Sequence, residues 1–516
     1  MSWGEDILIE KEFSVRKDNN TSIQPSPVWQ GFDAKCLDNW SSKEDAAKAY
    51  SSGKFSKAAK GFKDFVDASC PNDPEARIYQ NNAEAQSSSN RIYRIVVSVP
   101  ISRKNGEGGL DSQEILRGVE LAQYKINEEE ILSNSTKLVV GILDDGPFED
   151  TIERERGAAK VAAKKIKENL FIPLGVVGHF SSDATEEASK EYEGKLVSIS
   201  PTSTAVRCDS ESAQQACISQ AQVKLSSYVF RTSPSDRISA KTLADYHADT
   251  VGGNVAVVYQ GDSIYSNSFK EAFREAYDKT NSQVINPKID SDEKDPCNIW
   301  GKGNSRTSRA CLDYAQNKDA KALLLVPRNK DVGKLLGKDG ILTLNSMHQE
   351  YSFALLGSDS MYDQSFFKPL AERMVVSVPW LRSPDYNEYP IEKMARGRYL
   401  IGVGGDPAKI SWRTAMSYDA TYALAEGIAK ASNFSCWKER LNPLNPDAQL
   451  KCIRSNLKSV LTSDFSSQGS TDEDDAHTVR FNDGDRESDS SLAQLCKSTA
   501  SGYGFLEVDD SPKCDR

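Results

Sequence analysis

Two short stretches rich in serine and threonine are the part of the chain best suited to binding chemistry. The first, Gly-His-Phe-Ser-Ser at 178–182, follows an apolar run at 172–177, and the second, Ser-Pro-Thr-Ser-Thr at 200–204, follows an apolar run at 196–199. Hydroxyl groups donate hydrogen bonds without carrying charge. The side chains expected to converge on one small polar ligand are Ser181, Ser182, Thr202, Ser203 and Thr204.

The elements around these stretches read as strand, turn, helix, strand and turn. Consecutive strands of an open parallel sheet lie side by side, and the turns at their carboxyl ends face one crevice. The helix that begins near Ser182 points its amino terminus at the same place, where exposed N–H groups and the helix dipole favour an anion. The pattern therefore predicts a cradle for a carboxylate.

Length and composition exclude several classes of protein. The chain has 516 residues, which is room for about three domains of roughly 150 residues each. Its net charge of −11 argues against nucleic-acid binding, and no stretch approaches the ~18 to 20 apolar residues of a membrane helix. The first residues lack a basic region followed by an apolar core, so no signal peptide is predicted, and an exported protein would be present in mature or trimmed form.

Ten cysteines, with no Cys-x-x-Cys motif and no histidine at zinc-finger spacing, favour disulfides over metal binding. A bridge that closes a loop of ~15 residues contributes about 3 kcal/mol when it is unstrained. Disulfides persist in oxidising compartments, so an extracytoplasmic protein is expected, the alternative being ten free thiols in the cytosol. Sequence leaves the connectivity open, but neighbours make natural pairs: Cys36–Cys70, Cys208–Cys217, Cys297–Cys311, Cys436–Cys452 and Cys496–Cys514.

The N-terminal part of the chain differs from the rest. Residues 1–45 form an extension without clear periodicity, whereas 46–90 carry apolar residues at helical spacing. The order Ala-x-x-x-Gly-Lys-Phe-x-x-Ala-x-x-x-Phe, followed by Pro-x-x-Pro, resembles a tetratricopeptide helix pair with a further helix after it. A single repeat rarely buries its own face, so this hairpin is expected to pack on the next domain or to bind a peptide.

From residue 91 onward, apolar runs typical of buried strands alternate with helical patterns. This alternation predicts α/β architecture with parallel sheets, and the length favours two lobes with a cleft between them. The expected strands are 92–99, 138–143, 172–177, 196–199, 228–233, 254–260, 322–326, 353–356 and 374–378. The expected helices are 111–127, 152–169, 236–247, 268–279 and 412–431, with a glycine-rich loop at 103–109.

Signatures of catalysis, cofactors and metals are missing from the sequence. The glycines at 103–109 do not follow Gly-x-Gly-x-x-Gly, and there is no Gly-x-Ser-x-Gly, His-Glu-x-x-His or Walker loop. His179 is expected to be structural, and the acidic tract at 464–489 lacks the spacing of an EF-hand loop. We therefore expect no enzyme activity, no cofactor and no metal.

The order of the motifs resembles type I periplasmic binding proteins, in particular the leucine/isoleucine/valine-type amino-acid receptors of ABC importers. The resemblance spans roughly residues 91–510, and the pairing of Gly-His-x-Ser-Ser with Ile-Ser-Pro-x-x-Thr is its specific part. The motifs that carry it are Arg117-Gly-Val-Glu-Leu-Ala, Val177-Gly-His-Phe-Ser-Ser, Ser198-Ile-Ser-Pro-x-x-Thr, Val229-Phe-Arg-Thr-x-Pro-Ser-Asp, Tyr259-Gln-Gly-Asp-Ser-Ile-Tyr, Gly357-Ser-Asp and Tyr418-Asp-Ala.

This resemblance implies two Rossmann-like lobes with parallel sheets, joined by a hinge of three crossings, plus a small α-helical segment at the N-terminus. Lobe 1 is expected to comprise 91–234 and 380–495, and lobe 2 to comprise 235–379 and 496–516. Candidate crossings lie near Thr232–Asp236 and Trp380–Pro384. The lobes of such proteins close over a ligand by hinge bending.

The ligand-binding residues of the family carry over to both lobes. In lobe 1, Ser182, Thr202 and Thr204 match positions that hold the α-carboxylate and part of the ammonium group of an amino acid. Thr202 and Ser203 stand where branched-chain receptors often have alanine, which makes the site more polar and narrower.

In lobe 2, Tyr265 matches an aromatic residue that covers the ligand, and Asp359 lies where a carboxylate meets the ammonium group. Tyr362 and Trp380 are expected to shape the side-chain pocket.

The resemblance implies an extracytoplasmic receptor, secreted or lipid-anchored and monomeric. It would capture an amino acid or a similar solute in the cleft and deliver it to the membrane permease of an ABC importer. Two alternatives stay open: the ligand-sensing domain of a signalling receptor, cut from a larger protein, and an interaction protein that uses the N-terminal hairpin. The sequence does not choose the solute.

Overall fold

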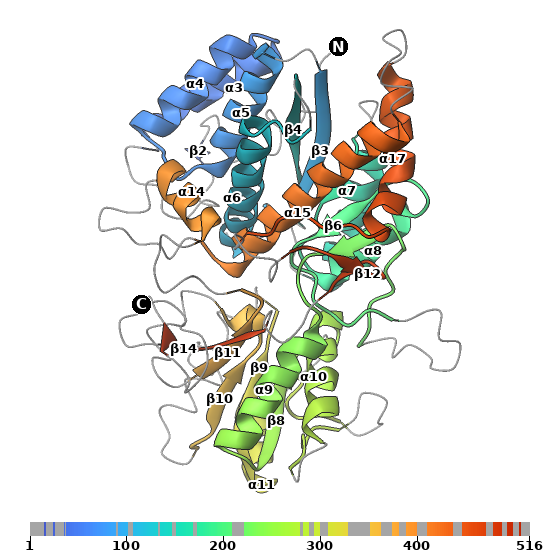
Figure 1. Cartoon of the computed structure of the whole chain (residues 1–516). Helices are drawn as coiled ribbons and strands as arrows, with labels where there is room; N and C mark the ends of the chain where they lie inside the picture. Colours follow the sequence, from blue (N-terminus) through green and yellow to red (C-terminus); the bar gives the residue numbers. More distant parts are fainter. Residues whose placement is uncertain are drawn as a thin grey trace. The chain divides into compact units, whose positions relative to one another are not determined.

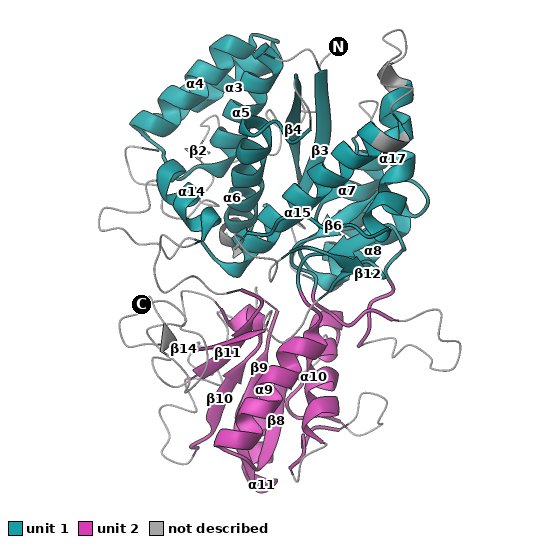
Figure 2. Ribbon diagram, viewed as in Figure 1, with its two compact units in different colours: residues 1–203, 225–233, 386–487 teal, residues 204–224, 234–385, 488–516 magenta. Residues whose placement is uncertain are grey.

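The computed structural model describes most of the chain, with gaps. The described residues are 15–16, 24–25, 36, 38–88, 91–101, 107–132, 135–146, 151–168, 173–208, 221–278, 282–287, 294–299, 308–328, 351–362, 374–380, 389–399, 410–436, 446–470, 478–487, 493–498 and 505–506. The chain divides into two compact units (Figure 2). Unit 1 comprises 1–203, 225–233 and 386–487, and unit 2 comprises 204–224, 234–385 and 488–516.

A seven-stranded sheet forms the centre of unit 1, in the order β12-β13-β7-β6-β5-β3-β4 (Figure 1). All neighbouring strands run parallel except β12 and β13. Short apolar runs between turns build these strands, as expected for a sheet that is buried on both faces. The strands are β3 Arg91–Val99, β4 Thr136–Asp144, β5 Val176–Val177, β6 Ser198–Ser200, β7 Val229–Arg231, β12 Phe481–Asn482 and β13 Asp485–Arg486.

Helices surround this sheet, and two of them approach each other closely at Gly118. The closely packed pair is α6 and α15, and Thr414 Oγ1 of α15 donates a hydrogen bond to the carbonyl oxygen of Glu114 at 3.0 Å. The helices of unit 1 are α3 Trp40–Ser51, α4 Phe55–Ala68, α5 Pro74–Ser88, α6 Glu107–Glu128, α7 Ile152–Glu168, α8 Ser182–Tyr192, α14 Pro390–Arg398, α15 Trp412–Lys430 and α17 Pro446–Thr462, with a π-helical turn, η4, at Ala431–Ser435. A separate hairpin pairs β1 Val15–Arg16 with β2 Gln24–Pro25.

The N-terminal helices α3, α4 and α5 are part of unit 1, and α5 contacts the edge strand β4 of its sheet. Strand β4 lies at the end of the sheet, so one row of its backbone groups has no neighbouring strand among the described residues. Asn82 of α5 accepts from the N–H of Val140 at 2.9 Å and donates to the carbonyl of Val140 at 2.8 Å. Asn127 of α6 makes the same pair of bonds with Leu138, at 2.7 and 3.0 Å. These amides take the place of an eighth strand and blunt the edge. The likeness of α3 and α4 to a tetratricopeptide hairpin stays a prediction.

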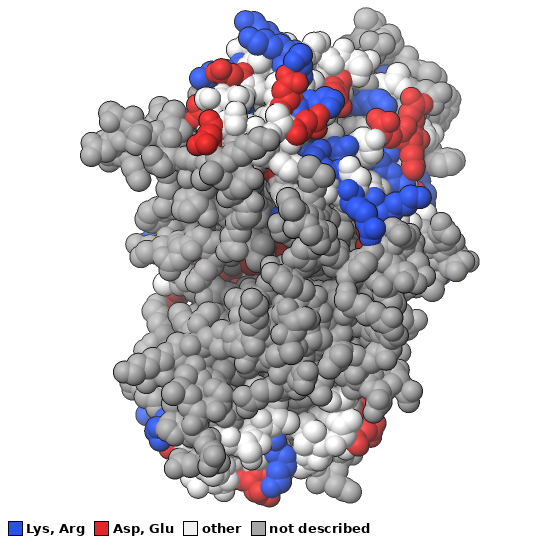
Figure 3. Space-filling model, turned by 90° about the vertical axis from the view of Figure 1, so that its left-hand side faces the viewer, with Lys and Arg blue, Asp and Glu red and all other residues white. Residues whose placement is uncertain are grey.

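The surface of the described residues mixes charges of both signs. On α4, Lys60 and Lys63 form exposed ion pairs with Asp64 and Asp67, one turn further along the helix. Among the described residues, which are those coloured in Figure 3, basic and acidic side chains lie interspersed. Such a surface is typical of a well-solvated protein, and exposed ion pairs of this kind contribute only ~0.3 to 0.5 kcal/mol each.

Unit 2 has a six-stranded sheet in the order β15-β14-β11-β10-β9-β8. Strands β8 to β11 run parallel, whereas β14 and β15 are antiparallel to their neighbours. The elements are α9 Asp236–Thr250, β8 Asn254–Tyr259, α10 Ile264–Tyr277, α11 Ser308–Asn317, β9 Ala320–Val326, β10 Ala354–Gly357, a 3₁₀ turn η3 Asp359–Met361, β11 Met374–Val378, β14 Gln494–Ser498 and β15 Phe505–Leu506. Apolar side chains from α9, α10 and the sheet form one buried core.

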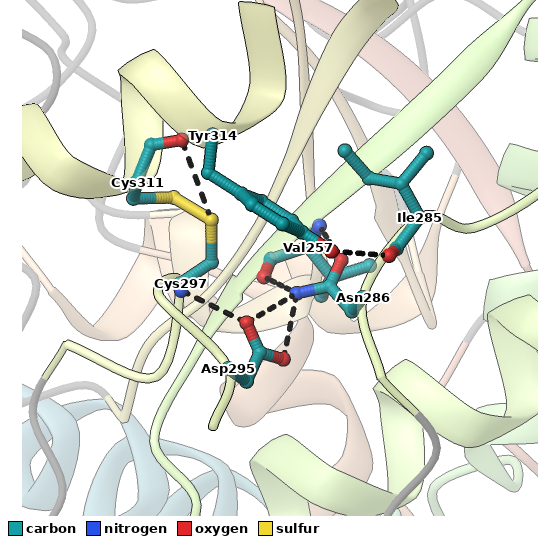
Figure 4. The surroundings of a disulfide bond; sticks show 7 residues. All are labelled: Val257, Ile285, Asn286, Asp295, Cys297, Cys311 and Tyr314. Atoms are coloured by element: carbon teal, nitrogen blue, oxygen red, sulfur yellow. Dashed lines mark hydrogen bonds between the residues drawn. A yellow bond between two sulfur atoms is a disulfide. The ribbon is translucent and has the colours of Figure 1, made fainter. Parts of the chain in front are cut away.

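The edge of this second sheet is also covered by an amide (Figure 4). Asn286 accepts from the N–H of Val257 in β8 at 2.6 Å and donates to the carbonyl of the same residue at 2.8 Å. Its amide also donates to Asp295, whose carboxylate accepts from the N–H of Cys297 at 2.9 Å. The disulfide Cys297–Cys311 then ties this segment to α11.

Three of the predicted disulfides are confirmed: Cys36–Cys70, Cys297–Cys311 and Cys436–Cys452. Cys208 and Cys496 are disulfide-bonded as well. Their predicted partners, Cys217 and Cys514, lie outside the described residues. The described residues contain no helix that is long and apolar enough to cross a membrane.

The predicted strands and helices are largely confirmed, with three informative differences. Helix α10 begins at Ile264 rather than at 268, because Ser263 caps it by accepting a hydrogen bond from the N–H of Ser266. Helix α6 begins at Glu107, inside the stretch 103–109 that was expected to be a loop. The other residues of that stretch, 103–106, lie outside the described residues. Strand β5 comprises only Val176–Val177; the preceding residues 173–175 are described outside a strand, although Leu174 and Gly175 bond to Arg94 and Val96 of β3 through their backbone.

The units also divide differently from the expected lobes. Residues 204–224 belong to unit 2 because their start is bonded to elements of that unit. The carbonyl of Thr204 accepts from the N–H of Asp236 at 2.8 Å, and the N–H of Val206 donates to Ser268 at 2.8 Å. Residues 488–495 belong to unit 2 as well, since β14 pairs with β11.

Candidate functional site

The loop after β5 turns at a position that only glycine fits. Gly178 has a φ of +142°, and a Cβ added there would lie 2.7 Å from the carbonyl oxygen of Ser98 in β3. Residues with a side chain rarely adopt such a backbone conformation. The glycine therefore lets the chain leave the sheet beside β3 and enter helix α8.

His179, the next residue, is buried and bonded at both ring nitrogens. Its Nδ1 lies 2.5 Å from Asp145 Oδ2, and its Nε2 lies 2.8 Å from the hydroxyl of Tyr192 at the end of α8. Ser98 donates to the same carboxylate at 3.0 Å. Burial raises the pKa of Tyr192 well above its usual range, so the phenol stays protonated. His179 holds the loop to α8 and β3, in agreement with the structural role expected for it.

Helix α8 begins with two serines that have different tasks. Ser181, not Ser182, is the N-cap: its hydroxyl accepts from the N–H of Ala184 at 3.1 Å and donates to Glu155 of α7. Ser182 is the first residue of the helix, and its side chain is buried. A hydroxyl in this position lies beside the N–H groups of the first helical turn, the part of a helix that favours anions.

The hydroxyls that follow β6 are buried and differ in what they contact. Thr202 donates to the carbonyl of Phe180 at 2.6 Å, and Ser203 donates to Ser182 at 3.3 Å. The Oγ1 atom of Thr204 is buried and has no hydrogen-bond partner among the described residues. A buried donor without a partner costs roughly 1 to 3 kcal/mol, which is a reason to expect that something else binds it.

The loop 200–204 is also held from the side of β7. Arg231 is fully buried, donates to the carbonyl of Ser203 at 3.3 Å, and is paired with Asp485 of β13 through Nε at 2.8 Å. Ser233 donates to the carbonyl of Pro201. The sequence analysis missed Arg231 and Asp485 because 254 residues separate them.

In unit 2, the structure brings together Tyr265 and Asp359, two of the predicted site residues. The Tyr265 hydroxyl, in the first turn of α10, donates to Asp359 Oδ1 at 2.5 Å, and its oxygen lies 2.8 Å from Ser358 Oγ. It also accepts from the N–H of Ser360 at 3.3 Å. Burial, reinforced by the Asp359 carboxylate, raises the pKa of Tyr265 well above its usual range.

Ser358 and Ser360 were not among the predicted site residues, although the signal for them was available. They belong to the stretch Gly-Ser-Asp-Ser at 357–360, which follows β10 as the hydroxyl-rich turns follow β5 and β6. Ser358 bonds to Ser360 at 2.9 Å and donates to the carbonyl of Leu325 in β9 at 3.3 Å. These bonds fix the turn that carries Asp359.

The remaining two predicted residues lie at the ends of elements in unit 2. Tyr362 follows the 3₁₀ turn, is half-buried, and its N–H donates to the carbonyl of Asp359 at 3.2 Å. Trp380 is buried two residues after β11. Their place in a ligand pocket stays a prediction.

No group of three or more metal-binding side chains occurs within the described ranges. Part of the acidic tract, 471–477 and 488–489, lies outside those ranges, so the tract is only partly described. The described groups are hydroxyls and amides in unit 1, and hydroxyls with the Asp359 carboxylate in unit 2.

The fold is that of the type I periplasmic binding proteins, with two mainly parallel α/β sheets and additional N-terminal helices. Comparison of sequences finds no matching family model and no matching curated protein. The disulfides Cys36–Cys70, Cys297–Cys311 and Cys436–Cys452 indicate an oxidising compartment.

Solved structures of ABC transporter binding proteins resemble this chain over most of its length. A substrate-binding protein of Desulfitobacterium hafniense in complex with Leu has 20% identity and a TM-score of 0.53, covering 81% of this chain and 100% of its own. A solute-binding protein of Rhodopseudomonas palustris in complex with 3,4-dihydroxybenzoic acid has 12% identity and a TM-score of 0.54, covering 81% and 94%. A type 1 periplasmic binding protein of Bordetella pertussis has 14% identity and a TM-score of 0.55, covering 80% and 99%. At these identities the likeness establishes the fold alone.

Proposed function

We propose that this chain is a solute-binding receptor that captures an amino acid or an amino-acid-like solute outside the cytoplasm and delivers it to the permease of an ABC importer. The observation that carries the proposal is the buried hydroxyl of Thr204, which has no hydrogen-bond partner among the described residues. Thr204 lies in the loop after β6, and its neighbour Ser203 donates to Ser182 at the start of α8. Binding and release, without chemistry, are its task, and a monomer suffices for it.

The groups described within the two units suit the two charges of an amino acid. The hydroxyls of Ser182 and Thr204 and the start of α8 suit a carboxylate, and Asp359 suits an ammonium group. Hydrogen bonds to charged groups are worth about 1.5 to 3 kcal/mol each. Four or five of them suffice for micromolar affinity after the costs of ordering are subtracted.

A thermal-shift screen tests the proposal most directly. The panel contains the twenty amino acids, small peptides, urea and short amides, together with 3,4-dihydroxybenzoate and benzoate. A solute that binds the folded state raises the unfolding midpoint, and the stabilisation grows with the logarithm of its concentration over its Kd. A shift with amino acids alone supports the proposal, and a shift with the aromatic acids alone replaces the amino acid by an aromatic carboxylate. If no member of the panel shifts the unfolding midpoint, the assignment as a solute-binding receptor is refuted.

Thr204→Val is expected to change affinity and stability in opposite directions. Valine keeps the shape and removes a hydroxyl that has no partner in the described structure, so the unfolding free energy stays constant or rises by up to about 1 kcal/mol. Loss of a hydrogen bond to a carboxylate weakens binding by roughly 10- to 100-fold. Calorimetric titration and denaturant unfolding of the same variant measure both.

The control for this variant is Thr242→Val in α9, whose hydroxyl donates to the carbonyl of Ile238 and which is outside the proposed site. It is expected to leave affinity unchanged. If Thr204→Val binds as tightly as the wild type, Thr204 does not contact the solute.

Asp359→Asn is expected to discriminate between solutes with and without an amino group. Asparagine still accepts the hydrogen bond of Tyr265 but no longer offers a charge to an ammonium group. The best amino acid of the screen should lose about tenfold or more in affinity, whereas the matching carboxylic acid without the amine should lose little. Equal losses would remove Asp359 from this role. Asp262→Asn, an exposed carboxylate just before α10, is the control.

A further inference from the structure

Three hydroxyls along β6 and the turn after it form a regular series of hydrogen bonds. Ser198 donates to the carbonyl of Gly178 at 2.6 Å, and Ser200 donates to the carbonyl of His179 at 2.8 Å. Thr202 donates to the carbonyl of Phe180 at 2.6 Å. The alternate residues 198, 200 and 202 thus bond to the carbonyls of three consecutive residues, 178–180, in the segment that follows β5. We call this series the hydroxyl ladder.

The hydroxyl ladder takes over where the backbone pairing of β5 and β6 stops. The last backbone bond between them runs from the N–H of Gly178 to the carbonyl of Ile199 at 3.0 Å. Beyond it the chain turns away toward α8, and the three hydroxyls bond to its carbonyls; that of His179 also accepts from Thr185 Oγ1 of α8 at 3.1 Å. Ser200 also accepts from the N–H of Ser203 at 3.1 Å, so one hydroxyl fixes both turns.

We infer that Ser198, Ser200 and Thr202 are positioning residues, which hold the loop 178–182 and the first turn of α8 ready for an anion. This inference rests on the proposed function and changes the roles within it. The hydroxyl of Thr202 is already bonded to Phe180 and that of Ser203 to Ser182, so both act on the solute through the loop. Thr204, two residues further on, continues the alternation and is the member of the series whose buried hydroxyl lacks a partner in the described chain.

The consequence for binding is a smaller ordering cost. The ladder holds the loop 178–182 and the amides at the start of α8 in place before a solute binds, which reduces the ordering cost of binding.

Hydrogen exchange in the solute-free protein tests the ladder without any assumption about the solute. Thr202→Val removes one rung and keeps the shape of the side chain. Amides in the segment 178–185 are expected to exchange about tenfold faster in this variant, because local opening costs less when a rung is missing. Thr202→Ser should restore the wild-type rates, since it keeps the hydroxyl.

Thr421→Val is the matched control for this experiment. Thr421 is buried in α15 of the same unit and donates to the carbonyl of Ser417 at 2.8 Å, so the change has the same chemistry at a place outside the ladder. It should leave exchange in 178–185 unchanged. Unchanged exchange in Thr202→Val, or equal acceleration in both variants, overturns the inference.

Calorimetric titration with L-leucine adds the functional readout. If L-leucine binds the wild type, Thr202→Val should weaken it about tenfold at a temperature where both proteins are fully folded. Faster exchange with unchanged affinity would refute the positioning role. If L-leucine does not bind the wild type, leucine is excluded as the solute. The hydrogen-exchange experiment then still tests whether the ladder holds the loop in place.

Discussion

Gly118→Ala is expected to lower the free energy of unfolding by at least ~3 kcal/mol, because the added methyl group has no space. A Cβ on Gly118 would lie 2.1 Å from the carbonyl oxygen of Thr414 and 2.8 Å from the amide nitrogen of Tyr418. Both atoms belong to the backbone of α15, so no side-chain rotation relieves the overlap. Helices α6 and α15 would have to separate, and the bond between Thr414 and Glu114 would be lost.

The control for this change is Gly157→Ala in α7. Nothing lies within 4 Å of a Cβ at Gly157, and alanine is the better helix former by about 1 kcal/mol. Denaturant unfolding should therefore show opposite signs for the two identical substitutions. A Gly118→Ala protein as stable as the wild type would mean that the two helices do not approach as described.

Arg486→Met is expected to cost about 3 to 5 kcal/mol of unfolding free energy, because it leaves a carboxylate buried without its partner. Arg486 Nη1 lies 2.8 Å from Asp419 Oδ2, and both side chains are at most 2% exposed. The other oxygen of Asp419 accepts from the N–H of Ser470 at 2.6 Å. The exposed pair Lys60–Asp64 is the comparison, and Lys60→Met should cost less than ~0.5 kcal/mol.

The loss of unfolding free energy in Arg486→Met is expected to depend on pH, with a definite sign. Burial raises the pKa of Asp419 above its ordinary value even beside Arg486, and removing Arg486 raises it further. The folded variant then binds a proton that the unfolded chain releases until the pH falls to the ordinary value of about 3.9. The difference in unfolding free energy between the wild type and Arg486→Met should therefore become smaller as the pH is lowered from 8 toward 5.

The double variant Arg486→Met with Asp419→Asn serves as the control, because it removes the charge and keeps an acceptor for Ser470. It should recover most of the lost stability, and its unfolding free energy should show no recovery on acidification. A pH-independent deficit in the single variant would contradict the explanation.

Local patterns in the sequence account for much of the fold. Alternating apolar runs and helical periodicities predicted the parallel α/β sheets, and strand β11 was predicted with its observed ends, Met374–Val378. Neighbouring cysteines predicted three bridges that the structure contains, because loops closed over short separations bring their ends together. Starts of helices were harder to predict. Ser263 and Ser181 cap α10 and α8, and which serine of several caps a helix depends on the path of the preceding loop.

The sequence by itself determined that serine and threonine follow β5 and β6 and that Tyr265 and Asp359 accompany them. Residue type and order are enough for that, since strands and turns are local. Only the tertiary structure decided which of these hydroxyls already form hydrogen bonds within the protein. Thr202 and Ser203 bond to groups about twenty residues earlier in the chain, whereas Thr204 does not, and hydrogen bonds between distant segments depend on packing that no local pattern encodes. For the same reason, the sequence did not predict that Gly118 packs against α15 or that Arg486 pairs with Asp419.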